Sequence, residues 1–322
     1  MDVLPDQSRL TIGFAHAAYQ LADEFRARGA PFACFEVRTL DELQVRVHEA
    51  DVLVVSGLWR NELLRQADRL RFIQSISAGT DQFARDLIAT KGVRLASAQG
   101  ANERAVAEHA MALILGLARQ LHRARDHQAR AHWRGMIADR RQREQELGGQ
   151  TLLILGLGRI GSRLAALARA FDMRVIGVKR QPTPVAGVEQ IVPPEKLREV
   201  LPQADFVALT CPLTPETEGL IGREQLEVMK SSSFLINVAR GRVVDESALI
   251  SALEQGTIAG AALDCFREEP LPPSSPLWHM TDVIMTPHSA GETQRYESNI
   301  IDLLQENLER LYRGDALRNQ IV

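Results

Sequence analysis

The chain has 322 residues, of which 45% are hydrophobic, and its formal net charge at pH 7 is -3. This length exceeds one average domain and the apolar content suffices for two cores, whereas a charge so near zero excludes the basic field that nucleic-acid binding requires. No apolar run reaches the roughly 20 residues that span a membrane, so we expect neither nucleic acid nor membrane among the partners.

The cysteines and the first ten residues indicate the compartment. Cys34, Cys211 and Cys265 are odd in number, scattered along the chain and without metal-ligand spacing. This usage indicates reduced thiols and no metal site. Because the first ten residues are too polar for a signal peptide, we expect a cytoplasmic protein.

The first hundred residues alternate short β-rich runs with amphipathic stretches. The predicted strands are 10–15, 33–37, 52–55, 72–77 and 93–97, and the predicted helices include 17–28, 41–50 and 81–90. This alternation is typical of a small doubly wound, flavodoxin-like parallel sheet. The loop Ser77-Ala78-Gly79-Thr80-Asp81 follows the fourth strand, and its backbone N–H groups could hold a carboxylate. A glycine turn with Thr80 as a helix cap is an equal alternative.

A long helix rich in Ala and Leu begins near residue 102. Its apolar residues cover most faces, which predicts burial between domains or against a second subunit. We interpret His109, on this helix, as a packed core or interface residue rather than a catalyst. The charged segment 123–146 follows and contains Trp133 as its single aromatic. Acidic residues interrupt its basic run, which favours a solvated connection or a dimer arm over a nucleic-acid patch.

An apolar run over 151–155 leads into a glycine-rich turn and then a helical pattern over 162–171. The turn reads Gly156-Leu157-Gly158-Arg159-Ile160-Gly161. Gly156 would permit the tight turn, Gly158 would let phosphates approach the backbone, and Gly161 would allow close packing of helix and strand. We therefore predict a dinucleotide site here, with a purely structural turn as the alternative.

The next predicted strand, 174–178, ends where an acidic residue would bind the ribose hydroxyls of NAD. This chain has Lys179-Arg180-Gln181 at that point. Two cations would attract the 2′-phosphate of NADP, so NADP is favoured over NAD. The alternative is that both cations are merely solvated at the end of a strand.

The remaining predicted strands, 206–210, 234–239, 259–264 and 283–286, are each followed by polar or reactive residues. Because ligands bind outside the carboxyl ends of parallel strands, Arg240, Glu269 and His288 should converge there. Hydride addition to a carbonyl needs a fixed cation and a proton donor beside the oxygen, which Arg240 and His288 could supply, with Glu269 stabilising the imidazolium. Taken singly, each residue has a structural interpretation. Arg240 could be a surface ion-pair partner, Glu269 a solvated loop residue and His288 a turn residue.

Nearly the whole chain resembles the D-isomer-specific 2-hydroxyacid dehydrogenases. The motifs are GLGRIG at Gly156, CPLTPET at Cys211, NVARGRVVDESAL at Asn237, LDCFREEPLP at Leu263 and TPHSAG at Thr286. The resemblance implies that Arg240, Glu269 and His288 are catalytic, and that Ala78 and Gly79 bind the substrate carboxylate together with Arg240. It also implies that Asp264 lies near the cofactor. The further cofactor-binding positions are Gly156, Gly158, Arg159, Ile160, Gly161, Lys179, Arg180, Cys211, Pro212, Thr217, Ala239, His288 and Ala290.

The same resemblance implies the domain organisation. Residues 1–100 and 290–322 would form the substrate-binding domain, residues 101–289 the NAD(P)-binding Rossmann domain, and the latter would make most of a homodimer interface. Lys179 makes the chain similar to the NADP-using glyoxylate and hydroxypyruvate reductases. Since we expect no regulatory domain after Val322, the long phosphoglycerate dehydrogenases match poorly.

The sequence thus predicts a two-domain α/β oxidoreductase that uses NADP, or else NAD, to reduce a small 2-keto acid to a D-2-hydroxy acid. The alternatives are an NAD-dependent dehydrogenase that oxidises a dedicated D-2-hydroxy acid and a corepressor-like protein that senses nucleotides. Trp133 and Trp278 could reach the substrate pocket or pack in an interface.

Overall fold

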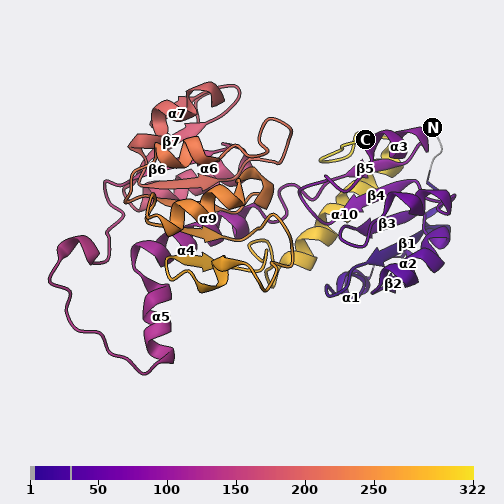
Figure 1. Ribbon diagram of the computed structural model, residues 1–322. Coiled ribbons are helices and arrows are strands. Elements are labelled where there is room, and N and C mark those ends of the chain that lie inside the picture. The colour runs from indigo at the N-terminus through magenta and orange to yellow at the C-terminus, as the bar shows by residue number, and fades with distance from the viewer. Residues whose placement is uncertain (1–3, 30) are drawn as a thin grey trace. The chain divides into compact units, whose positions relative to one another are not determined.

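The computed structural model describes residues 4–29 and 31–322, which form two compact units (Figure 1). The smaller unit runs up to Asn102 and includes Glu292–Val322, and the larger unit is Glu103–Gly291. The first three residues of the polar N-terminus lie outside the described residues. Each unit is built on its own parallel sheet, which confirms the predicted α/β class with two doubly wound domains.

The smaller unit contains a five-stranded sheet in the order β2-β1-β3-β4-β5. Its strands are β1 (Thr11–Ala15), β2 (Ala33–Val37), β3 (Val52–Val55), β4 (Phe72–Ser75) and β5 (Arg94–Ala96). Its helices are α1 (Leu21–Ala27), α2 (Leu40–Arg46), α3 (Arg85–Thr90) and α10 (Tyr296–Arg313). The C-terminal α10 packs on α1, so the two ends of the chain build one unit.

Alternating side chains divide the core of this sheet into two layers. Phe14 and Val54 pack with residues of α1 and α10 on one face, whereas Leu53 and Ile73 pack with residues of α2 and α3 on the other. Successive side chains of a strand point to opposite faces, so a sheet covered on both sides produces the continuous apolar runs seen in the sequence.

The larger unit contains a seven-stranded parallel sheet in the order β12-β11-β10-β9-β6-β7-β8. Its strands are β6 (Thr151–Leu155), β7 (Arg174–Val178), β8 (Gln190–Val192), β9 (Phe206–Leu209), β10 (Phe234–Asn237), β11 (Gly260–Leu263) and β12 (Val283–Met285). Its helices are α4 (Glu103–Ala118), α5 (Leu121–Ala129), α6 (Arg159–Ala170), α7 (Leu197–Val200), α8 (Arg223–Glu227) and α9 (Glu246–Glu254).

Two helical layers cover this sheet. On one face α4 and α6 pack against residues such as Ile154 and Ala208, and on the other α7, α8 and α9 pack against residues such as Leu155 and Val207. The strand order reverses between the adjacent strands β6 and β9. Such a reversal opens a crevice at the carboxyl ends of the two strands, which is where ligands bind in sheets of this type.

The structure differs from the predicted elements mainly in length. The predicted helix 81–90 begins only at Arg85, and Thr80 does not cap it, because Ala84 is the N-cap residue. Phe83 is instead buried against Trp59, with ring centroids 5.5 Å apart, which holds the preceding residues in a turn. Strand β8 was not predicted. Among the described residues, no helix is both long and apolar enough to cross a membrane.

The long helix predicted from residue 102 ends at Ala118, and a second helix, α5, begins three residues later. Gln120 between them has a left-handed backbone, with φ of 49°. Helix α5 contains the start of the charged segment 123–146, for which the sequence predicted a solvated connection or a dimer arm. Figure 1 shows α5 and the chain after it projecting from the larger unit.

Candidate active site

The glycine-rich turn joins the end of β6 to the start of α6. A side chain at Gly156, whose φ is +104°, would place its Cβ 2.7 Å from the backbone of Cys211, and a Cβ at Gly161 would lie 2.2 Å from the Gly156 carbonyl oxygen. At Gly158, by contrast, no atom of the described residues other than its chain neighbours lies within 4 Å of the Cβ position. The turn is therefore closed toward the sheet and open at Gly158, where an anion could meet backbone N–H groups at a helix start.

The first residues of α6 continue this surface. Arg159 opens the helix, and its guanidinium forms an ion pair with Glu103, the first residue of α4. Ile160 is partly buried and packs on the core beneath α4 and α6. The helix start thus presents one cationic side chain beside the turn.

At the end of β7 lie the two cations that the sequence singled out. The Lys179 amide donates to the carbonyl oxygen of Val192 at 3.0 Å, which keeps Lys179 in line with β8. Its ammonium group donates to the Thr183 hydroxyl at 2.9 Å, and Arg180 is exposed.

The loop after β9 is shaped by Thr217. Its hydroxyl donates to the Pro212 carbonyl at 2.6 Å and accepts from the Thr214 amide at 2.8 Å, which closes the turn. Cys211, at the start of this loop, is buried, and burial raises the pKa of its thiol to about 11. Cys211 is therefore a protonated packing residue and not a nucleophile.

His288 and Glu269 are in direct contact although each follows a different strand. His288 Nδ1 lies 2.7 Å from Glu269 Oε2, and the other oxygen, Oε1, accepts from the Phe266 amide at 2.9 Å. The hydrogen bond to Glu269 raises the pKa of His288 against the opposing effect of burial. Burial would raise the pKa of Glu269, but the hydrogen bonds from His288 and Phe266 hold it below its usual range. The pair therefore favours a charged imidazolium beside a carboxylate.

Arg240 follows β10 and is held at its backbone by Asn237. The buried Asn237 carboxamide accepts from the Ala239 amide and donates to the Arg240 carbonyl, both at 3.0 Å. The Arg240 side chain donates to the Ala239 carbonyl at 2.8 Å. Its positive charge lowers the pKa of both His288 and Glu269, so all three belong to one electrostatic site. Sequence reasoning gave Asn237 no role, although it lies in the same motif.

The loop that carries His288 is wrapped around the carboxylate of Asp264. Oδ1 of Asp264 accepts from the Thr286 hydroxyl at 2.6 Å and from the Ser289 amide at 2.9 Å, and Oδ2 accepts from the Ala290 amide at 3.1 Å. Asp264 is 1% exposed and Ala290 is also buried. Between these anchored residues, His288 has a left-handed backbone with φ of 54°. Asp264 thus fixes the chain on both sides of His288.

Ala78 and Gly79 lie in the smaller unit, after β4. Among the residues that the structure describes, neither of their backbone N–H groups donates a hydrogen bond. Beside them the hydroxyls of Ser56 and Ser77 are 2.6 Å apart. The side-chain amide of Gln82 donates to the Ser56 hydroxyl at 3.0 Å, and these contacts tie the loop to the end of β3. Both residues are partly exposed.

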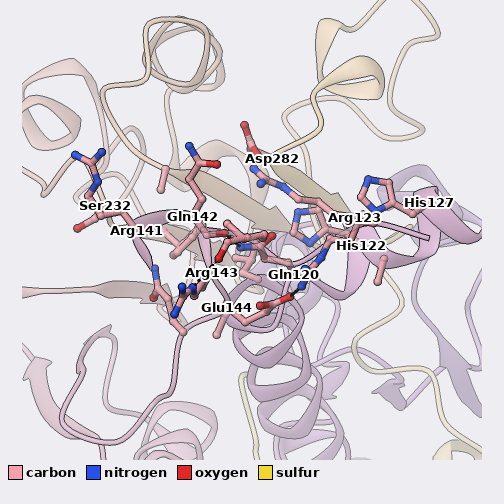
Figure 2. Close-up of a pocket in the computed structure, with 18 of the residues that line it drawn as sticks. Gln120, His122, Arg123, His127, Arg141, Gln142, Arg143, Glu144, Ser232 and Asp282 are labelled. Atoms are coloured by element: carbon pink, nitrogen blue, oxygen red, sulfur yellow. Dashed lines mark hydrogen bonds and ion pairs between the residues drawn. The ribbon is translucent and has the colours of Figure 1, made fainter. Parts of the chain in front are cut away.

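The larger unit also contains a cavity, which lies at the opposite end of the strands from Arg240, Glu269 and His288. This cavity, of about 1170 Å³, is lined by α5, the segment 131–145 and residues at the amino ends of β10, β11 and β12 (Figure 2). Because the strands are parallel, all their amino ends lie on one side of the sheet, and the residues that follow the strands lie on the opposite side. Trp133 on the segment is 97% exposed, and Trp278 is 51% exposed.

Comparison with known proteins identifies the family. The NAD-binding domain of the D-isomer-specific 2-hydroxyacid dehydrogenases matches residues 111–290. A glyoxylate/hydroxypyruvate reductase B of Yersinia pestis is 36% identical over 86% of this chain and 86% of its own length. A D-3-phosphoglycerate dehydrogenase of Methanocaldococcus jannaschii is 35% identical over 88% of this chain, which spans only 54% of that relative.

The solved structure of a family protein from Aeromonas salmonicida agrees with this chain with a TM-score of 0.85 at 29% identity, covering 98% of this chain and 99% of that one. The chain therefore belongs to the D-isomer-specific 2-hydroxyacid dehydrogenase family, as the motifs predicted. It is an oxidoreductase with a nicotinamide cofactor, and the enzyme names of its relatives do not favour the corepressor-like alternative.

Proposed function

We propose that this enzyme reduces small 2-keto acids of the glyoxylate and hydroxypyruvate type to D-2-hydroxy acids, with NADPH as the preferred cofactor. The observation that carries the proposal is the His288–Glu269 contact of 2.7 Å, with Arg240 acting electrostatically on both. These residues follow the adjacent strands β10, β11 and β12 in a domain of the NAD-binding family. The similarity to a glyoxylate/hydroxypyruvate reductase supports the substrate class.

The proposed chemistry divides between a cation and an acid. When bound, the nicotinamide supplies the hydride. Arg240 binds the substrate carboxylate and stabilises the charge that develops on the carbonyl oxygen, since its planar fork matches a carboxylate. His288 donates a proton to that oxygen from Nε2, and Glu269 keeps the imidazolium charged and oriented through Nδ1. In the smaller unit, the Ala78 and Gly79 amides are proposed to bind the substrate carboxylate.

The cofactor is proposed to lie along the carboxyl ends of the larger sheet. The open face of the turn at Gly158 and the start of α6 at Arg159 and Ile160 suit a pyrophosphate, because the space around the Cβ position of Gly158 is open among the described residues. Lys179 and Arg180 would bind the 2′-phosphate of NADP. The remaining predicted contacts, in the loops after β9, β10, β11 and β12, are proposed to be made by Cys211, Pro212, Thr217, Ala239, Asp264 and Ala290.

We propose further that two copies of this chain form a homodimer through α5 and the segment after it. Trp133 and Met136 on that segment are almost fully exposed, and Trp133 lines a cavity of about 1170 Å³. Figure 2 shows the side chains of α5 and of residues 141–144 around this hollow. Exposed apolar side chains next to a concave, polar-rimmed surface suit a self-complementary interface between copies.

Light scattering tests the dimer. The unsubstituted protein should have twice the mass of one chain, and Trp133→Asp with Met136→Asp should shift it toward the monomer. A monomer without substitutions would contradict this proposal and leave the catalytic one intact. We also propose a reducing, cytoplasmic location, supported by the unpaired Cys34, Cys211 and Cys265.

The catalytic proposal is tested by steady-state reduction of glyoxylate, hydroxypyruvate, pyruvate, phenylpyruvate and branched 2-keto acids with NADPH or NADH. We expect the highest kcat/KM for glyoxylate or hydroxypyruvate with NADPH. A clear preference for a bulky keto acid would contradict the substrate class, and a preference for NADH would contradict the cofactor. Chiral separation of the product should give the D-isomer.

A further inference from the structure

His109 on α4 contacts the loop that carries His288. Its Nε2 lies 3.0 Å from the Thr286 hydroxyl and 3.6 Å from Asp264 Oδ1, and its side chain is only 23% exposed. The sequence indicated a packed core or interface residue rather than a catalyst. The structure adds that His109 lies at the end of the hydrogen-bond network that surrounds Asp264.

The direction of each hydrogen bond follows from the atoms involved. The Thr286 hydroxyl has one proton, which it donates to Asp264 Oδ1 at 2.6 Å. The contact between this hydroxyl and His109 Nε2 therefore requires the ring nitrogen to donate. The network runs from His109 to Thr286 to Asp264, and Asp264 accepts in turn from the Ser289 and Ala290 amides.

This network surrounds a backbone in an uncommon conformation. His288 has φ of 54°, a left-handed conformation that few residues other than glycine adopt. The residues on both sides of His288 are bonded to Asp264, whose orientation depends on the Thr286 hydroxyl. That hydroxyl is itself held by His109, which removes its freedom to rotate away from Asp264.

We propose that His109 is a positioning residue for His288 and acts through Thr286 and Asp264. This inference rests on the proposed function, in which His288 is the proton donor. All four residues belong to the larger unit, whereas the chain passes to the smaller unit at Glu292, shortly after His288. The network therefore keeps the proton donor fixed to the sheet that carries Arg240 and Glu269.

The decisive variants are His109→Leu, which removes the ring N–H, and His109→Gln, which retains a side-chain N–H donor at similar reach. His48→Leu is the matched control, because His48 is exposed in the smaller unit. Hydrogen exchange of the Ser289 and Ala290 amides is the first readout. We expect exchange to become about 5-fold faster or more in His109→Leu, and to stay unchanged in His109→Gln and in the control.

The second readout is kinetic. We expect kcat for keto-acid reduction to fall by about 10-fold in His109→Leu, with the NADPH dissociation constant within about twofold of that of the unsubstituted enzyme. His109→Gln should restore most of the loss. Thr286→Val should reproduce His109→Leu, and the double variant should be no worse than Thr286→Val alone, because both act through one hydroxyl.

Two results would overturn the inference. One is unchanged exchange at Ser289 and Ala290 in His109→Leu, and the other is equal damage in His109→Gln and His109→Leu, which would leave His109 with packing alone. If His109→Leu does not fold, His109→Phe, which keeps a ring without the N–H donor, supplies the same comparison with His109→Gln. Because exchange requires no turnover, it decides the matter even if the unsubstituted protein reduces none of the keto acids offered.

Discussion

Glu269 Oε2 lies 2.7 Å from His288 Nδ1, although the two residues follow different strands and are 19 positions apart in sequence. The contact raises the pKa of His288, and in the proposed mechanism the other ring nitrogen, Nε2, gives the proton to the substrate. A carboxylate on one nitrogen of an imidazole and a substrate oxygen at the other is an efficient arrangement for general acid catalysis.

Replacing Glu269 with Gln should narrow the pH range of keto-acid reduction at its alkaline end. In the proposed mechanism reduction needs protonated His288, so activity should fall as pH rises through the pKa of His288. Glu269 raises this pKa, and removing its charge moves the fall to lower pH. The pH dependence of kcat measures the change, with Glu268→Gln as the exposed neighbouring control. Identical profiles for Glu269→Gln and the unsubstituted enzyme would show that Glu269 does not support the imidazolium.

Replacing Arg240 with Ala should lower kcat/KM for the keto acid by a factor of about 1000, as expected for the loss of an electrostatic stabiliser at the reacting oxygen. Arg242→Ala is the matched control, because Arg242 lies two residues further on and forms an exposed ion pair with Glu218. Steady-state kinetics on both variants check the prediction. Similar activity in the two would remove Arg240 from the mechanism.

Asp264→Asn should lower both thermal stability and kcat. The buried carboxylate accepts from Thr286, Ser289 and Ala290, and a carboxamide leaves at least one of these donors unpaired. An unpaired buried donor costs about 1–3 kcal/mol. Calorimetric unfolding together with kcat tests this expectation. A normal melting temperature with normal kcat would mean that Asp264 does not hold the His288 loop.

Lys179→Asp should move the cofactor preference from NADPH toward NADH. A carboxylate repels a 2′-phosphate and can accept from ribose hydroxyls, so the ratio of kcat/KM for NADPH to that for NADH should fall by about 10-fold or more. Lys196→Asp, at an exposed position of the same unit, controls for the change in net charge. Equal ratios in both variants would place the 2′-phosphate elsewhere.

Two glycines of the turn should respond differently to alanine. Gly158→Ala should leave the melting temperature unchanged, since the added Cβ meets none of the described residues within 4 Å apart from its chain neighbours, but it should weaken cofactor binding. Gly161→Ala should destabilise the fold, because its Cβ would lie 2.2 Å from the Gly156 carbonyl oxygen. Calorimetry and nicotinamide fluorescence separate the two effects. Undiminished cofactor affinity in Gly158→Ala would contradict the proposed pyrophosphate site.

Much of the fold could be predicted from the sequence because both sheets are parallel and buried on both faces. Such strands are recognisable as continuous apolar runs, for example 151–155 and 206–210. The residues that follow them must lie on the same side of the sheet, at the carboxyl ends of the strands. The contact of Glu269 with His288 follows from that rule. Strand β8 was missed because Gln190–Val192 has only three residues, and α5 because its charged sequence lacks a buried face.

The contacts between distant segments could not be predicted in the same way. The hydrogen bond of His109 with Thr286 joins residues 177 positions apart, and no local pattern marks it. The bonds of Asp264 to Ser289 and Ala290 depend on the left-handed backbone at His288, which the sequence does not disclose. Thr217 matched a family motif, but its hydroxyl is engaged in closing its own loop, which only the structure reveals.

The most direct test of the account compares the unsubstituted enzyme with His288→Ala in the consumption of NADPH in the presence of hydroxypyruvate or glyoxylate. We expect rapid consumption with one of these acids and a loss of kcat by a factor of about 1000 in His288→Ala, with little change in NADPH affinity. Equal rates in the two proteins, or tight NADPH binding without turnover of either acid, would contradict the proposed function.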